Sequence, residues 1–109
     1  MVVRFACPHL KEEVELTEER RRHIGERHPD LLPQDLDRIA ETLLDPDQVR
    51  KSARFSGARL FSRWRDDLWG GKHVVVVVVS EAGLRGRHWI VTAYVARRLV
   101  EGEVEWSSG

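Results

Sequence analysis

The sequence holds one cysteine, Cys7, so no disulfide can form within the chain. Its longest apolar run, residues 74–79, is six residues long, whereas a membrane-spanning helix needs about 20. The first ten residues, MVVRFACPHL, lack the small-residue cleavage pattern of a secretory signal peptide. These features predict a cytoplasmic domain with no membrane segment, or a domain that is carried on a larger secreted protein.

Familiar catalytic motifs are also missing. The sequence has no G-x-S-x-G nucleophile turn, and its glycine pair at 70–71 lies outside any phosphate-binding loop motif. His23 and His28 are five residues apart, which separates them by about 140° around a helix. Zinc-binding histidines on one helix are spaced by four residues and share a face. The sequence therefore predicts neither a metal site nor a cofactor.

The 18 basic and 18 acidic side chains balance to zero, but they are unevenly distributed along the chain. Residues 1–47 carry 7 basic and 12 acidic side chains, a net of −5, whereas residues 48–99 carry 11 and 3, a net of +8. One explanation is a basic surface that binds a polyanion. The other is an acidic helical layer that pairs with a basic sheet inside one fold. The sequence alone leaves both explanations open.

Hydrophobic periodicity and capping signals predict the secondary structure. After a short strand at 13–16, Thr17 is a good N-cap for a first helix, and Pro29 ends that helix at or near His28. A second helix follows Pro33, with apolar residues at helical spacing at positions 36, 39, 40, 43 and 44. After residue 47 the period changes to two, which predicts strands at 49–55, 59–64, 72–80 and 88–96 and a short terminal strand or helix.

Helices followed by strands predict an α+β fold in which two N-terminal helices pack on one face of a mainly antiparallel four-stranded sheet. The chain is expected to form one domain, 1–109, with an N-terminal arm at 1–12 and a frayed tail at 107–109. Side chains of the last long strand alternate between the two faces of the sheet. We expect the apolar set to face the helices and the other set to lie on the open face. The apolar set is Trp89, Val91, Ala93 and Val95, and the other set is His88, Ile90, Thr92 and Tyr94.

These residues suit RNA cleavage by transesterification, in which the 2′-hydroxyl of the substrate is the nucleophile. The protein must supply a base, an acid and cations that stabilise the charge on phosphorus. Histidine titrates near neutrality, arginine binds phosphate oxygens in pairs, and hydroxyls donate to them. The predicted catalytic residues are His23, His28, Arg54, Arg63, Thr92 and Tyr94. The predicted substrate-binding residues are Arg59, Lys72, His88 and, as a stacking platform, Trp69.

Each candidate also has a purely structural explanation. His23 can pack at a helix edge, and His28 can cap a helix C-terminus. Arg54 and Arg63 can be solvated strand charges, and threonine and tyrosine are common in any sheet.

Five segments follow one another between about residues 14 and 98: LTEERRRHIGERHPDLL, IAETLLDPDQVRKS, RLFSRW, HVVVVVVSEAG and WIVTAYVAR. Their order resembles the small toxin-type nucleases of the barnase–EndoU–colicin–RelE group, in particular the branch associated with phages and mobile elements. The shared marks are a helix that ends in His-Pro, a P-D-x-V turn after the second helix, and a final strand that reads T-A-Y.

The resemblance implies a barnase- or RelE-like fold and metal-independent cleavage of tRNA, mRNA or other cellular RNA. It also implies an antitoxin or immunity protein as a partner. Carried over by motif, the active residues are His23 and His28, one of Arg54, Arg63 and Lys72, and Thr92 with Tyr94. Two other functions remain open: a nucleic-acid-binding module without catalysis, and a protein-interaction domain of a phage or toxin–antitoxin system.

Overall fold

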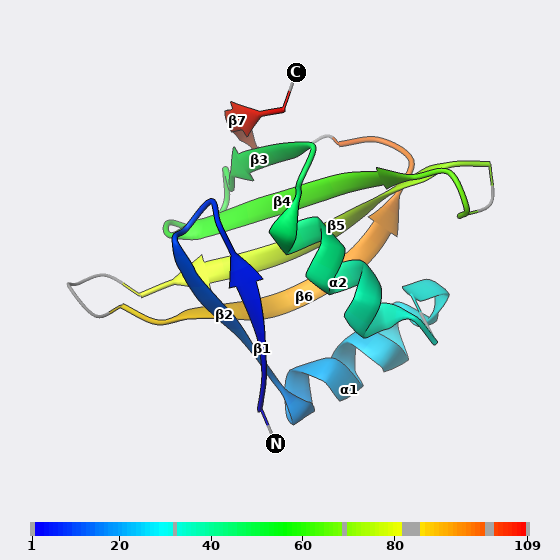
Figure 1. The fold of residues 1–109 in the computed structure, drawn as a ribbon, viewed down its shortest axis with the longest axis horizontal. Helices are drawn as coiled ribbons and strands as arrows, with labels where there is room; N and C mark the ends of the chain where they lie inside the picture. Colours follow the sequence, from blue (N-terminus) through cyan, green and yellow to red (C-terminus); the bar gives the residue numbers. More distant parts are fainter. Residues whose placement is uncertain (1, 32, 69, 82–85, 100–101, 109) are drawn as a thin grey trace.

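The computed structural model describes residues 2–31, 33–68, 70–81, 86–99 and 102–108. Among these residues, two α-helices, one short 3₁₀ helix and seven strands follow one another along the chain (Figure 1). They are β1 (Val2–Cys7), β2 (Glu12–Thr17), α1 (Glu18–Arg27), η1 (Pro29–Leu31), α2 (Asp35–Leu44), β3 (Gln48–Lys51), β4 (Ala58–Arg65), β5 (Lys72–Ser80), β6 (His88–Ala96) and β7 (Glu103–Ser107). No helix in the described part of the chain is long and apolar enough to cross a membrane.

The prediction of a four-stranded, mainly antiparallel sheet is wrong. The described strands form one mixed sheet of seven, in the order β1-β2-β6-β5-β4-β3-β7, and β2 runs parallel to β6. Residues 2–7, expected in an arm, pair with β2 along their whole length, and residues 103–107 pair with β3. The period-two pattern of VVRFAC, which buries Phe5 and Cys7, is the local strand signal for β1.

The first helix has the ends that its sequence predicts. The side chain of Thr17 accepts a hydrogen bond from the N–H of Arg20 at 3.2 Å, and Glu18 lies in the first turn, where the helix dipole favours an anion. His28 is the C-cap, and its own N–H donates to the carbonyl oxygen of Ile24 at 2.7 Å. Pro29 then begins η1. His28 therefore lies at an abrupt change of chain direction.

The second helix covers one face of the sheet (Figure 1). Ile39 and Leu43 of α2 are fully buried against it. Alternate residues of the strands face these helix residues and form the core, among them Val49, Phe61, Val74, Val76, Val78, Ala93 and Val95. The opposite face, turned away from α1 and α2, is called the open face below.

A register shift in β6 changes which residues face the helices. Val77 pairs with Thr92 but the next residue, Val78, pairs with Ile90, so Val91 is an extra residue in its strand. Ile90 is consequently buried in the core, and Val91 lines a groove on the open face. The predicted assignment of side chains to the two faces is therefore wrong for residues 88–91 and correct for residues 92–95.

Candidate functional site

The open face of β4, β5 and β6 is hollowed by two adjoining compartments. They share three lining residues, Arg54, Leu60 and Tyr94. The first, of about 200 Å³, is called the basic compartment and is also lined by Arg50, Ser62, Val75, Ala96, Arg98 and Leu99. The second, of about 470 Å³, is called the apolar compartment and is also lined by Ser52, Phe55, Ser56, Ala58, Val77, Val79, Val91 and Thr92. Together they form the groove that we consider as the functional site.

Three arginines reach the basic compartment from three different segments. Arg50 lies on β3 opposite Leu60 of β4, and its Nε donates to the side-chain oxygen of Gln48 at 2.7 Å. Arg54 lies in the β3–β4 turn, and Arg98 follows the end of β6 by two residues. Neither Arg54 nor Arg98 forms an ion pair with a described carboxylate. Positive charge therefore collects in a concave surface, where it attracts anions most strongly.

Tyr94 and His28 meet at the rim of this groove. Tyr94 pairs in register with Val75 of β5, and its ring centroid lies 5.8 Å from that of His28, with the planes tilted by 42°. β2 pairs with β6 at a single register position, between Glu15 and Trp89. The part of β6 that carries Tyr94 therefore packs beside α1 and η1, which brings the helix end to the sheet.

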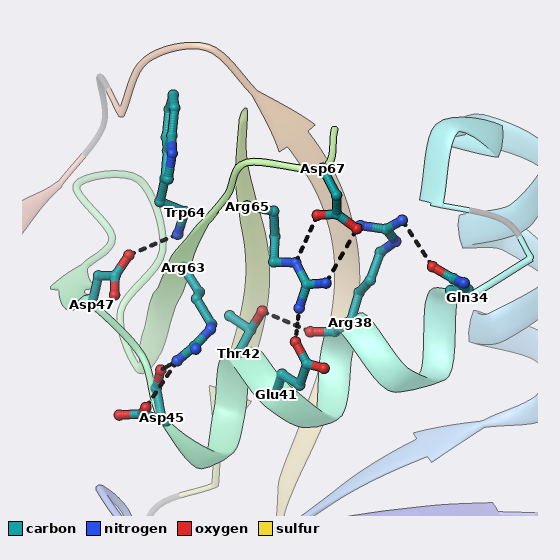
Figure 2. Close-up of polar contacts among 10 residues, drawn as sticks. All are labelled: Gln34, Arg38, Glu41, Thr42, Asp45, Asp47, Arg63, Trp64, Arg65 and Asp67. Carbon is teal, nitrogen blue, oxygen red and sulfur yellow. Dashed lines mark hydrogen bonds and ion pairs between the residues drawn. The ribbon is translucent and has the colours of Figure 1, made fainter. Parts of the chain in front are cut away.

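Arg63 lies on the other face of β4. Its Nη1 donates to the carboxylate of Asp45 at 2.9 Å and to the carbonyl oxygen of the same residue at 2.6 Å. Figure 2 shows this pair beside a second group of contacts, in which Arg65 donates hydrogen bonds to Asp67 and to Glu41, a residue of α2. The ring of Trp64 points to the opposite side of the strand. These arginines tie β4 to the second helix, away from the groove.

Arg59 also faces away from the groove. It donates to both carboxylate oxygens of Glu105, at 3.2 and 2.9 Å, and His9 contacts the same carboxylate at 2.6 Å. Hydrogen bonds from His9 and Arg59 outweigh the opposing effect of burial and hold the pKa of Glu105 below its ordinary value. We call this trio the clasp. It joins the β1–β2 turn to β4 and β7.

The other predicted substrate contacts are distributed elsewhere. His88 hydrogen-bonds Ser80 at 2.7 Å, and it lies six residues, about 20 Å at the rise of a strand, from Tyr94. Lys72 shares the strand face of Val74, which is the helix-covered one. His23 lies on α1 about 140° around the helix axis from His28. Trp69 lies outside the described residues.

Several groove residues were not singled out from the sequence. Arg50, Phe55 and Arg98 carry no local motif, and their convergence depends on strand register. His73 lies on the open face and packs edge-on against Trp64 at 4.9 Å between centroids. Desolvation lowers the pKa of His73; the negative charge of Asp47 opposes this effect, and the positive charge of Arg50 adds to it. His73 pairs in register with Ala96, which lines the basic compartment. Side chains alternate along β5, so His73 lies on the same face of the sheet as Val75.

Ion pairs between the two halves of the chain account for part of the uneven charge. Basic residues of the second half pair with acidic residues of the first, as in Arg63 with Asp45 and Arg87 with Glu15. The arginines of the groove supply the remaining concentration of positive charge. No cluster of three or more histidine, cysteine, aspartate or glutamate side chains able to hold a metal ion occurs within the described ranges.

Comparison with known proteins identifies no relative of this chain. The chain matches no family model, no curated protein and no solved structure.

Proposed function

We propose that the groove binds RNA and cleaves it by metal-independent transesterification. The observation that carries the proposal is the meeting of His28 with Tyr94 at the rim of a compartment lined by three arginines. These groups are the base, the acid and the phosphate-binding cations that this reaction needs. The substrate would be cellular RNA in the cytoplasm, and an acidic antitoxin or immunity protein could cover the same groove.

The proposed roles follow from the chemistry of each side chain. The imidazole of His28 accepts the proton of the 2′-hydroxyl, whose oxygen then attacks phosphorus. The hydroxyl of Tyr94 gives its proton to the leaving 5′-oxygen as the bond between that oxygen and phosphorus breaks. The products are a 2′,3′-cyclic phosphate and a 5′-hydroxyl end.

The arginines stabilise the extra negative charge on phosphorus. Arg54 and Arg98 are exposed and have no described carboxylate as a partner, so they can turn toward an incoming phosphate. Guanidinium groups bind two phosphate oxygens at once. The role predicted for Arg63 passes in this proposal to Arg50, Arg54 and Arg98.

The test is incubation of the purified protein with total RNA in the presence of a chelator. We expect products with 2′,3′-cyclic phosphate ends. His28→Ala and Tyr94→Phe should each lower the rate by about 10²- to 10⁴-fold, the range for loss of one acid–base group. Glu26→Ala, on the exposed side of the same helix, is the matched control and should cleave at the normal rate.

Two results would contradict the proposal. One is the absence of cyclic phosphate ends at any salt concentration. The other is an unchanged rate in the double variant with His28→Ala and Tyr94→Phe. Salt-dependent RNA binding without products would instead support the binding module, since counterion release drives binding but breaks no bond.

A further inference from the structure

The apolar compartment has chemistry that phosphate binding does not explain. Leu60, Val77, Val79 and Val91 line it, and so does Phe55, which is 68% exposed. At about 470 Å³ it is more than twice the volume of the basic compartment. An exposed phenylalanine over an apolar hollow favours a flat, weakly polar ligand.

Phe55 is presented by a fixed turn. The hydroxyl oxygen of Ser52 accepts hydrogen bonds from the N–H groups of Arg54 at 3.1 Å and Phe55 at 3.2 Å. The carbonyl oxygen of Phe55 in turn accepts from the N–H of Ala58 at 3.3 Å. Gly57 completes the turn with a φ of +81°, which favours glycine. Two consecutive residues, one cationic and one aromatic, are therefore held together at the groove.

The two compartments constrain what can fill them. Because Arg54, Leu60 and Tyr94 line both, an occupant of the apolar compartment lies directly beside an anion in the basic one. A nucleotide has this combination, with a charged phosphate and a planar base joined through a sugar. The hydroxyl groups of Ser56 and Thr92 at the apolar compartment can serve the polar edge of the base.

We infer that the apolar compartment binds one unpaired nucleobase, stacked on Phe55, next to a phosphate bound in the basic compartment. The inference rests on the proposed function, because it assumes that the basic compartment holds a phosphate of RNA. A paired base is stacked within its duplex and cannot enter a hollow of this kind without leaving the stack. Single-stranded RNA is therefore the substrate class that the groove selects.

Calorimetric titration with inorganic phosphate, ribose 5-phosphate and adenosine 5′-monophosphate tests the inference on the full chain. The nucleotide should bind about 5- to 150-fold more tightly than ribose 5-phosphate, which is the gain expected from stacking one base on an aromatic ring. Phe55→Ala should remove most of this preference and leave ribose 5-phosphate affinity unchanged. Leu44→Ala is the matched control, since Leu44 is 57% exposed at the end of α2.

Each outcome decides between the two proposals. Equal affinity for the nucleotide and ribose 5-phosphate, or equal behaviour of Phe55→Ala and Leu44→Ala, overturns the base compartment but leaves the phosphate site intact. If none of the three ligands binds, the basic compartment is no phosphate site and both proposals fail. In a competition experiment, single-stranded RNA should displace the nucleotide at lower concentration than a duplex of the same length; equal displacement refutes selection of an unpaired base.

Discussion

Glu105→Gln should weaken the attachment of the last strand to the rest of the fold. The carboxylate accepts from His9 at 2.6 Å and from Arg59 at 2.9 and 3.2 Å, and its side chain is 18% exposed. Hydrogen bonds to a charged group contribute about 1.5–3 kcal/mol each in favourable cases. Glutamine keeps the shape and one acceptor but loses the charge, so we expect a loss of about 2 kcal/mol in the free energy of unfolding.

The effect should depend on pH with a defined sign. The pKa of Glu105 is lowered in the folded protein, so its contribution to stability is present above the ordinary glutamate pKa of about 4.3. That contribution is lost as the pH falls through the lowered value, because the unfolded chain then binds the proton more readily. The difference between Glu105→Gln and the unchanged protein should therefore be full at pH 7 and shrink toward zero in acid.

Urea unfolding followed by tryptophan fluorescence measures this difference. A loss of about 2 kcal/mol corresponds to a midpoint shift of roughly 1 M, given the usual urea dependence for a small domain. Glu103→Gln, at an exposed position of the same strand, is the control and should change stability by less than about 0.5 kcal/mol. Equal midpoints for the two variants at pH 7, or a difference that does not shrink as the pH falls below the ordinary glutamate pKa, would refute the role of the clasp.

Two further substitutions test how the fold is supported around the groove. Gly71→Ala should lower stability by about 1–3 kcal/mol in urea unfolding, because Gly71 has a φ of +93° and an added Cβ would clash with the ring of Trp64; an unchanged midpoint would contradict this. Asp35→Asn should cost about 2 kcal/mol, because Asp35 is 1% exposed and its carboxylate accepts from Arg21 of α1 at 3.1 Å; thermal unfolding without a fall in midpoint would refute it.

Local signals in the sequence predicted local structure well. Thr17 and Pro29 marked the ends of α1, and strands β5 and β6 have the predicted limits, 72–80 and 88–96. Capping and period depend on neighbouring residues, so a single segment contains the information. The β1 strand shows the limit of this reasoning, because a pattern as short as VVRFAC becomes a strand only when a partner such as β2 pairs with it.

Long-range pairing decided what the sequence left ambiguous. Alternation places Arg59, Phe61 and Arg63 on one face of β4, but only the packing of Phe61 in the core shows that the helices cover that face. The register shift at Val91 also leaves no signal in the sequence. Ile90 and Val91 are both β-branched and apolar, so each is equally suited to face the core. Two of the predicted groove residues, Thr92 and Tyr94, lie beyond this shift, where the expected alternation holds.

The position of Arg98 links the groove to the stability of the C-terminal strand. In the sheet, β5, β4 and β3 separate β6 from β7, so the chain must cross three strands after Ala96. Arg98 and Leu99 begin that crossing and line the basic compartment on the way. The far end of the crossing is held by β7, through its pairing with β3 and through the carboxylate of Glu105 on Arg59 and His9. Arg59, on the helix-covered face, therefore contributes to the groove indirectly, because it helps to hold the strand that follows Arg98 in the chain.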